Sequence, residues 1–162
     1  MNIFATDDDP VLSAWNLDDK RLPKMILETA QLLSTAVWKI EGRECGLYKP
    51  THTGHPCTLW TMAATDNFMW LVNHGEALNT EYRYRFEAPD HKSVLIIRRA
   101  LDVVDRYNFP RIDRTEFANC TNLTGNIPVV KLYRQYMIQS KWGLDATWRK
   151  RGRPEWAKTH KV

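Results

Sequence analysis

A carboxylate, Glu28, is the first residue whose setting suits acid–base chemistry. A helix over 19–40, turning about 100° per residue, places Glu28 at the border of its buried face, on a polar flank with Arg21 and Lys24. Partial burial disfavours a charged carboxylate whereas neighbouring cations favour it, and this balance suits a group that both holds and releases a proton. The alternative, which spacing alone favours, is a plain surface pair between Lys24 and Glu28.

The first long loop carries His52, His55 and Cys57, with Cys45 upstream. Imidazoles and thiols are ligands that zinc takes in tetrahedral sites, but the gap between Cys45 and His52 matches no standard zinc spacing. We therefore expect no metal and no other cofactor, and we keep a zinc site centred on His52, His55 and Cys57 as an alternative. In the favoured interpretation His55 caps a helix or packs against a neighbour, while Lys49 and His52 are available to an anion.

Basic and aromatic residues are concentrated at the carboxyl end. The last 32 residues hold nine Lys or Arg against two acidic residues, whereas the first 130 residues hold 14 against 17. Such asymmetry indicates a polyanionic partner. Indoles that alternate with cations, as at Trp148, Arg149 and Lys150, can stack on bases while neutralising phosphates. The tryptophans of the tail could instead fasten it to the core, and the two roles are compatible.

Composition restricts the class of protein. The 162 residues are 43% hydrophobic and 26% charged, which is typical of one globular domain, with a core over 1–140 and a tail over 141–162. The longest aliphatic run, Val94–Ile97, is far short of the roughly 18–20 residues that a membrane span needs. Three scattered cysteines form no disulfide framework. We expect a cytoplasmic monomer that does not enter a membrane.

Apolar periodicity identifies the elements that must position these groups. Asp18 or Asp19 can cap the helix over 19–40, Gly42 can end it, and the acidic triplet before Pro10 can cap a short helix. Strand signals are weak, and 108–128 is expected to be irregular. The sequence predicts a compact, all-α, single-domain helical bundle with irregular loops, whose later helices lie over about 58–79, 91–107 and 129–141.

Three parts of the chain carry a family pattern: Leu17–Glu28 with Leu32-Leu33, then Tyr48–Pro56, and finally Thr147–Lys150. Together they resemble the pyrimidine-dimer DNA glycosylase family. The resemblance covers both ends and the first loop, and it leaves 80–130 unmatched. It implies an all-α protein of a bacterium or phage-infected cell that acts on double-stranded DNA as both a glycosylase and an abasic-site lyase.

The resemblance also implies a mechanism. An N-terminal α-amine would attack the deoxyribose C1′ and form an imine, and β-elimination would then cleave the sugar. Met1 would supply the amine, or Asn2 if Met1 is removed, and Asn is a poor residue for that processing. Glu28 corresponds to the catalytic carboxylate. The α-amines of proteins ordinarily have a pKa of about 7.7–8.0. At neutral pH they are therefore partly neutral and nucleophilic, whereas lysines are almost fully charged.

Two positions depart from the family pattern, since Leu27 and Gln31 stand where the family has arginines. Two alternatives therefore remain: an enzyme acting on a modified base or a free nucleotide, and a non-catalytic DNA-binding protein on the same scaffold. Under the favoured interpretation, the residues expected to line the site or hold the nucleic acid are Arg21, Lys24, Gln31, Lys49, His52, His55, Trp148, Arg149 and Lys150.

Overall fold

The computed structural model describes residues 1–143 and 145–158, and all regular structure in this part of the chain is helical. The predicted all-α fold is confirmed. In chain order the elements are α1 (Pro10–Trp15), α2 (Leu22–Glu41), α3 (Pro56–Ala63), α4 (Thr65–Phe86), α5 (Val94–Val103), a 3-10 turn (Arg106–Asn108), α6 (Val129–Tyr136), a π-helical turn (Met137–Lys141) and α7 (Glu155–Lys158).

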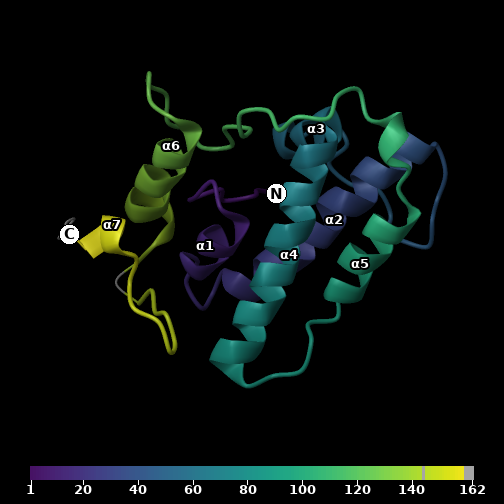
Figure 1. The fold of residues 1–162 in the computed structure, drawn as a ribbon. Helices are drawn as coiled ribbons and strands as arrows, with labels where there is room; N and C mark the ends of the chain where they lie inside the picture. Colours follow the sequence, from purple (N-terminus) through teal and green to yellow (C-terminus); the bar gives the residue numbers. More distant parts are fainter. Residues whose placement is uncertain (144, 159–162) are drawn as a thin grey trace.

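The two longest helices, α2 and α4, pack against each other and form the centre of the molecule (Figure 1). α3 and α5 both contact this pair, and α1 packs on α4. In Figure 1, α6 and α7 lie beyond α1, on the side away from α5. The described part of the chain contains no helix with the length and apolar character that crossing a membrane requires.

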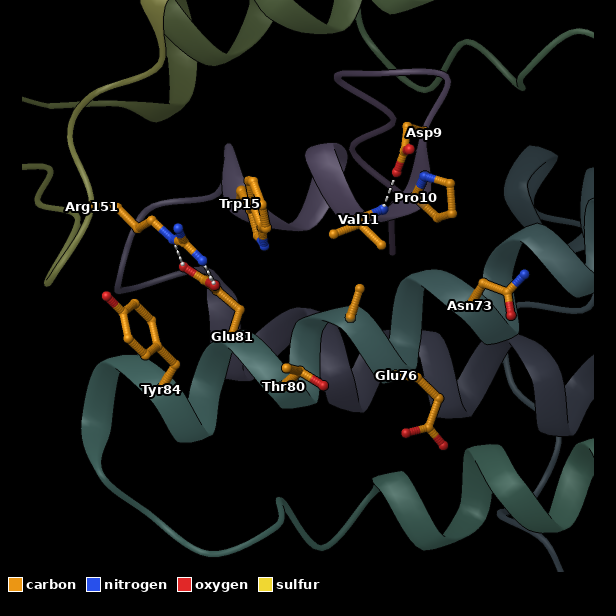
Figure 2. Close-up of a pocket in the computed structure, with 11 residues that line it drawn as sticks. Asp9, Pro10, Val11, Trp15, Asn73, Glu76, Thr80, Glu81, Tyr84 and Arg151 are labelled. Atoms are coloured by element: carbon orange, nitrogen blue, oxygen red, sulfur yellow. Dashed lines mark hydrogen bonds and ion pairs between the residues drawn. The ribbon is translucent and has the colours of Figure 1, made fainter.

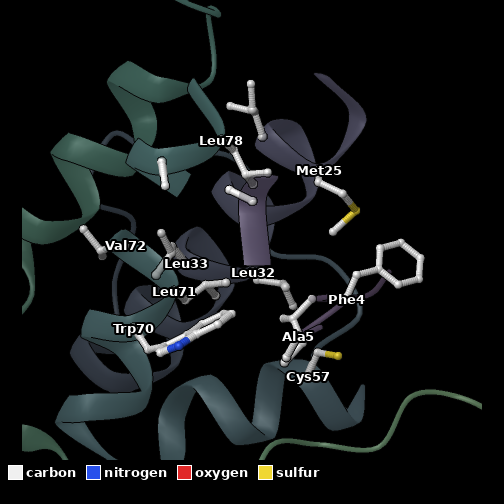
Figure 3. Packing of buried hydrophobic residues seen from close by; sticks show 14 of the residues in the cluster. Phe4, Ala5, Met25, Leu32, Leu33, Cys57, Trp70, Leu71, Val72 and Leu78 are labelled. Carbon is white, nitrogen blue, oxygen red and sulfur yellow. The ribbon is translucent and has the colours of Figure 1, made fainter. Parts of the chain in front are cut away.

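The apolar stripe of α2 faces the core, as its spacing predicts (Figure 3). Its side chains are fully buried at Leu22, Met25, Ile26, Leu33, Ala36 and Val37. Figure 3 shows Leu71 and Leu78 of α4 meeting this surface. Burying a side chain of this size contributes roughly 1.5–3 kcal/mol, so the stripe anchors α2 and fixes which of its residues face outward.

The ends of α2 differ in how well sequence predicts them. Gly42 ends the helix with φ 67°, a left-handed conformation that suits glycine. The start is Leu22, later than expected, and the capping prediction for Asp18 or Asp19 is wrong. Asp18 instead accepts N–H groups of the preceding turn, from Lys20 at 3.1 Å and Arg21 at 3.3 Å.

The predicted helix over 58–79 is in fact two helices. Ala64 is extended, with φ −155° and ψ 151°, and separates α3 from α4. The first free N–H groups of α4 bind a distant segment: Thr65 N–H donates to the Arg111 carbonyl and Asp66 N–H to that of Ile112, both at 2.9 Å. These long-range bonds compensate for the break, and apolar spacing contains no trace of them.

The helix predicted over 91–107 is shorter in the structure, where α5 covers Val94–Val103. Val104 is extended, and the next residue, Asp105, donates its N–H to the Glu41 carboxylate at 2.8 Å. A contact from the end of α2 thus draws the chain out of the helix. The helix predicted over 129–141 is confirmed as α6 followed by the π-helical turn.

Gly75→Ala is expected to lower the free energy of unfolding by about 1–3 kcal/mol, the usual cost of overpacking a core. α4 lies close to its neighbours at Gly75, where an added Cβ would lie 2.6 Å from Ile97 Cδ1 and 2.9 Å from Thr29 Cγ2. Urea unfolding would measure the loss. Gly152→Ala is the matched control because an added methyl meets nothing within 4 Å there. Equal stability of the two variants would contradict this account of the α4 contact.

Candidate active site

The amino-terminal segment folds into the core. Ile3 and Ala5 are fully buried, and the Asn2 side chain holds the bend between them. Its Oδ1 accepts the N–H groups of Ile3 at 2.8 Å and Phe4 at 3.0 Å, and Phe4 takes a left-handed conformation with φ 43°. These local bonds turn the chain, so that Met1 is directed to the exposed edge of α2.

At that edge the amino end meets Glu28. Oε2 of Glu28 accepts the Asn2 N–H at 2.9 Å and lies 3.8 Å from the Met1 amine. Oε1 lies 3.6 Å from Lys24 Nζ. The Glu28 side chain is 12% exposed whereas that of Lys24 is 69% exposed, so the carboxylate is enclosed on the amine side and open toward Lys24. The side chain of Met1 is 3% exposed, so Met1 is more deeply packed beside Glu28 than Lys24 is.

Below the amino end lies a cluster of thiols. Asn2 Nδ2 donates to the Cys120 carbonyl at 3.3 Å, and Cys120 Sγ lies 2.7 Å from Cys57 Sγ. Cys57 is in the first turn of α3, where His55 accepts its N–H on Nδ1 at 3.1 Å. Tyr133 of α6 completes the group, since its hydroxyl accepts the Cys120 N–H at 3.2 Å. Residues from three separate segments therefore form the cluster beneath the chain's first residues.

Burial and charge alter the acidities of this cluster. Burial lowers the pKa of His55, and the positive terminal amine and His52 lower it further. A hydrogen bond from Cys57 lowers the pKa of Cys120 to about 7, and the same contact raises the pKa of Cys57. Burial raises the pKa of Tyr133. The amine thus lies near a neutral imidazole and a thiol that ionises readily.

Several predicted residues lie at this amine–carboxylate site, and others do not. Met1, Asn2 and Glu28 are in contact, with Lys24 beside them. His55 is near enough to the positive terminal amine for its pKa to be lowered by that charge. The remaining members of the predicted set on the first half of the chain are Arg21, Gln31, Lys49 and His52.

Those four residues occupy different settings. Arg21 forms an ion pair with Asp18 at 2.9 Å. Gln31, half-buried, follows Glu28 by one turn of α2. Lys49 and His52 are exposed on the loop before α3, and the His52 ring lies 6.3 Å from that of His55. Lys49 and His52 are therefore free to reach a ligand, whereas Arg21 is already paired.

The possible metal ligands that the structure brings together differ from those that the sequence suggests. His55, Cys57 and Cys120 offer ligand atoms within 4.8 Å of one another. Cys45 is elsewhere, with its thiol bonded to the Arg43 carbonyl, and His52 bonds Thr51 through Nδ1. Of the predicted zinc ligands His52, His55 and Cys57, the structure keeps His55 and Cys57 in one group and replaces His52 with Cys120.

The tail is fastened to the body by its indoles. The Trp148 ring is buried, its Nε1 donates to the Asn16 carbonyl at 3.0 Å, and it packs edge-on against Trp142. Trp142 in turn donates to Asp18. Stacking of Trp148 on a base is therefore excluded in this conformation, while the exposed Arg149 and Lys150 keep their charges outward.

A hollow of about 640 Å³ lies between α1 and α4, away from Glu28 (Figure 2). Figure 2 shows Arg151 closing one end of it, with its guanidinium paired to Glu81 at 2.9 Å. The guanidinium also lies over the rings of Trp15 at 4.2 Å and Tyr84 at 4.9 Å. Because Nε and Nη2 of Arg151 both bond Glu81, this hollow is a place where the tail attaches to the body and is separate from the amine site.

Sequence reasoning missed Cys120 and Tyr133. Cys120 lies in the stretch expected to be irregular, within the region 80–130 that the resemblance leaves unmatched, and Tyr133 lies in the helix predicted over 129–141. The one signal in the sequence that could have identified Cys120 was its residue type, because a thiol can pair with the thiol of Cys57. Its position below Asn2 depends on packing across 118 residues of sequence.

An amine and a carboxylate, two groups with opposite roles in proton transfer, define this site in an all-helical protein. A comparison with protein families finds one that matches: the model of the pyrimidine dimer DNA glycosylase family covers residues 1–92. The chain belongs to this family. The match spans Glu28, His55 and Cys57 and leaves out Cys120 and the basic tail. No curated protein and no solved structure matches the chain.

Proposed function

We propose that this protein is a DNA glycosylase and abasic-site lyase that uses the amine of Met1 as its nucleophile and Glu28 as its acid–base group. The contact of the Met1 amine with Glu28 at 3.8 Å carries the proposal. Family membership supports glycosylase activity on a pyrimidine lesion. A monomer acting on double-stranded DNA in a bacterial or phage-infected cell completes the proposal.

The reaction begins with the neutral amine. Its nitrogen forms a bond to the deoxyribose C1′, and the C1′–N1 bond to the pyrimidine breaks with its electron pair leaving on the base. Glu28 takes a proton that the attacking nitrogen loses and is positioned to deliver it to the ring oxygen O4′, which leaves C1′ as the sugar ring opens. The product is an imine between Met1 and C1′, and the carboxylate of Glu28 stabilises its positive charge.

Strand cleavage follows from the imine. Removal of a proton from C2′ expels the 3′ phosphate, because the imine accepts the electron pair through C1′. Water then hydrolyses the imine and frees the amine. Glu28, deprotonated after its first transfer, is the base nearest to the terminal amine among the described residues. One carboxylate thus serves both steps.

The proposal requires the nucleotide to leave the duplex, which costs a few kcal/mol and is offset by contacts to phosphate. Lys24, Lys49, His52 and Arg149 are exposed or extend into solvent and can supply these contacts. Gln31 stands beside Glu28 and can donate to a phosphate or base. Lys150 pairs with Glu87, so its charge is partly satisfied.

Borohydride trapping tests the proposal directly. A duplex that carries a cyclobutane pyrimidine dimer or an abasic site is expected to yield a covalent adduct, since borohydride reduces an imine to a stable amine. Absence of an adduct with both substrates, together with tight duplex binding, would instead support the non-catalytic DNA-binding alternative. Tryptic mapping should place the adduct on Met1–Lys20 with normal cleavage after Lys20, because only an adduct on Lys20 itself blocks that cleavage.

Duplex affinity is expected to fall steeply with salt, with a slope of log K against log salt of about −0.9 for each phosphate that is neutralised. Lys49→Ala and Arg149→Ala should each make the slope shallower by about 0.9. Lys39→Ala is the control, because Lys39 is exposed on α2 about 22 Å along the helix from Lys24. Fluorescence anisotropy would measure the slopes. A flat dependence would favour the free-nucleotide alternative.

A further inference from the structure

Two cysteines that the proposed reaction does not use approach each other directly below the amino terminus. Cys57 Sγ and Cys120 Sγ are 2.7 Å apart although they lie 63 residues apart in sequence. Cys57 is fully buried, whereas Cys120 is half-buried and is the member that solvent reaches. Tyr133 fixes the backbone around Cys120 by accepting its N–H and donating to the Ala118 carbonyl at 2.7 Å. The contact is therefore built by the fold.

The distances fit a dithiol better than a metal site. Zinc holds each thiolate at about 2.3 Å, which in a tetrahedral site separates two sulfurs by about 3.8 Å. Cys57 and Cys120 are more than 1 Å closer than that. The third candidate ligand, His55, already uses Nδ1 to accept the Cys57 N–H. A small inward movement of either sulfur, by contrast, reaches the bond length of about 2.05 Å of a disulfide.

We propose that Cys57 and Cys120 form a reversible redox site in which a small hydroperoxide oxidises Cys120 and Cys57 resolves the product as a disulfide. Cys120 is the attacking residue because it is the accessible member and its ionised form accepts a hydrogen bond from Cys57. Cys57 is the resolving residue because the fold holds its thiol in contact with that sulfur.

The electrons and atoms balance with the peroxide as oxidant. The Cys120 thiolate attacks one peroxide oxygen, an S–O bond forms, and the O–O bond breaks to release water or an alcohol after protonation. Cys57 sulfur then attacks the sulfenic sulfur of Cys120, the S–S bond forms, and the S–O bond breaks to release water. Two thiols lose two electrons to one peroxide, and a cellular thiol reverses the oxidation by exchange.

Oxidation would tie the start of α3 to the segment that supports the amino end. The Cys120 carbonyl accepts a hydrogen bond from the Asn2 side chain, so the disulfide would restrict the movement of the segment that supports Asn2 and Met1. Since the bond closes a long loop, the thermal midpoint should rise by about 5–15 °C on oxidation and return on reduction. The thiol chemistry stands whether or not the protein forms an imine.

Counting thiols by mass after peroxide treatment tests the proposal. The reduced protein, denatured and treated with N-ethylmaleimide, should gain three adducts, and the peroxide-treated protein should gain one, on Cys45. Peptide mapping should identify the Cys57–Cys120 bond. Cys57→Ser should leave a sulfenic acid on Cys120 that dimedone captures, whereas Cys120→Ser should leave the buried Cys57 unreacted.

Three outcomes would overturn the inference. All three thiols of the wild-type protein could remain free under peroxide, or the bond that forms could join two molecules through Cys45. The purified protein could also contain one equivalent of zinc that protects Cys57 and Cys120 until a chelator removes it, which would establish a metal site instead. Because the wild-type mass map alone decides among these results, the test does not depend on the folding of either variant.

Discussion

Glu28→Gln is expected to reduce cleavage of a dimer-containing duplex by about 10²–10⁴-fold, the usual loss when an acid–base group is removed. Gln is isosteric and its amide oxygen can still accept the Asn2 N–H that Glu28 accepts at 2.9 Å. What it loses is the negative charge beside the Met1 amine and the ability to exchange a proton. Gel analysis of cleavage under single-turnover conditions would measure the change.

Two comparisons make this result specific to the site. Glu44→Gln removes an exposed carboxylate from the loop after α2 and should cleave at the wild-type rate. The thermal midpoint and duplex affinity of Glu28→Gln should stay near those of the wild type. An unfolded Glu28→Gln protein, or one that cleaves normally, would remove Glu28 from the proposed mechanism.

Dimethylation of the terminal amine is expected to abolish borohydride trapping, since a tertiary amine cannot form an imine. The comparison that matters is with Lys24, whose Nζ lies 3.6 Å from Glu28 and is the rival amine at the site. Lys24→Met should still yield the trapped adduct. Mass spectrometry of the trapped complexes would assign the modified nitrogen in both cases.

The opposite pattern would reassign the chemistry. If Lys24→Met loses the adduct while the dimethylated protein keeps it, the nucleophile is a lysine and the role of Met1 is structural. The same spectra show whether Met1 is present, and hence whether Met1 or Asn2 bears the amine.

The helical fold and one side of the site could be predicted from sequence because they depend on local rules. The stripe of α2 has a 3.6-residue period, and Gly42 is a residue that ends helices. The position of Glu28 at the border of the stripe follows from the same period, because it depends only on the angle of each residue around the helix axis. The contact of Glu28 with the amino terminus is not local, and among the sequence arguments only the family resemblance implied it.

The errors at the ends of α3, α4 and α5 have a common physical origin in contacts between distant segments. The break at Ala64 is stabilised by the carbonyls of Arg111 and Ile112, and α5 ends where Asp105 meets Glu41. Cys120 reaches the site by the same kind of packing. A periodic pattern reports which face of a helix is buried, but it holds no information on which remote backbone group completes its hydrogen bonds.

The support of Asn2 by Cys120 has a consequence for how this lineage can diversify. The family match ends at residue 92, so the amino end and Glu28 lie in the matched portion, while Cys120, whose carbonyl accepts the Asn2 side chain, lies in the unmatched portion. In a chimera that exchanges the residues after 92 with those of a relative, the segment that supports Asn2 would therefore come from the relative, while the amino end would stay native. Such a chimera should keep this support only when the donor places a backbone carbonyl within reach of the Asn2 side chain, as residue 120 does here with its N–H bonded to Tyr133.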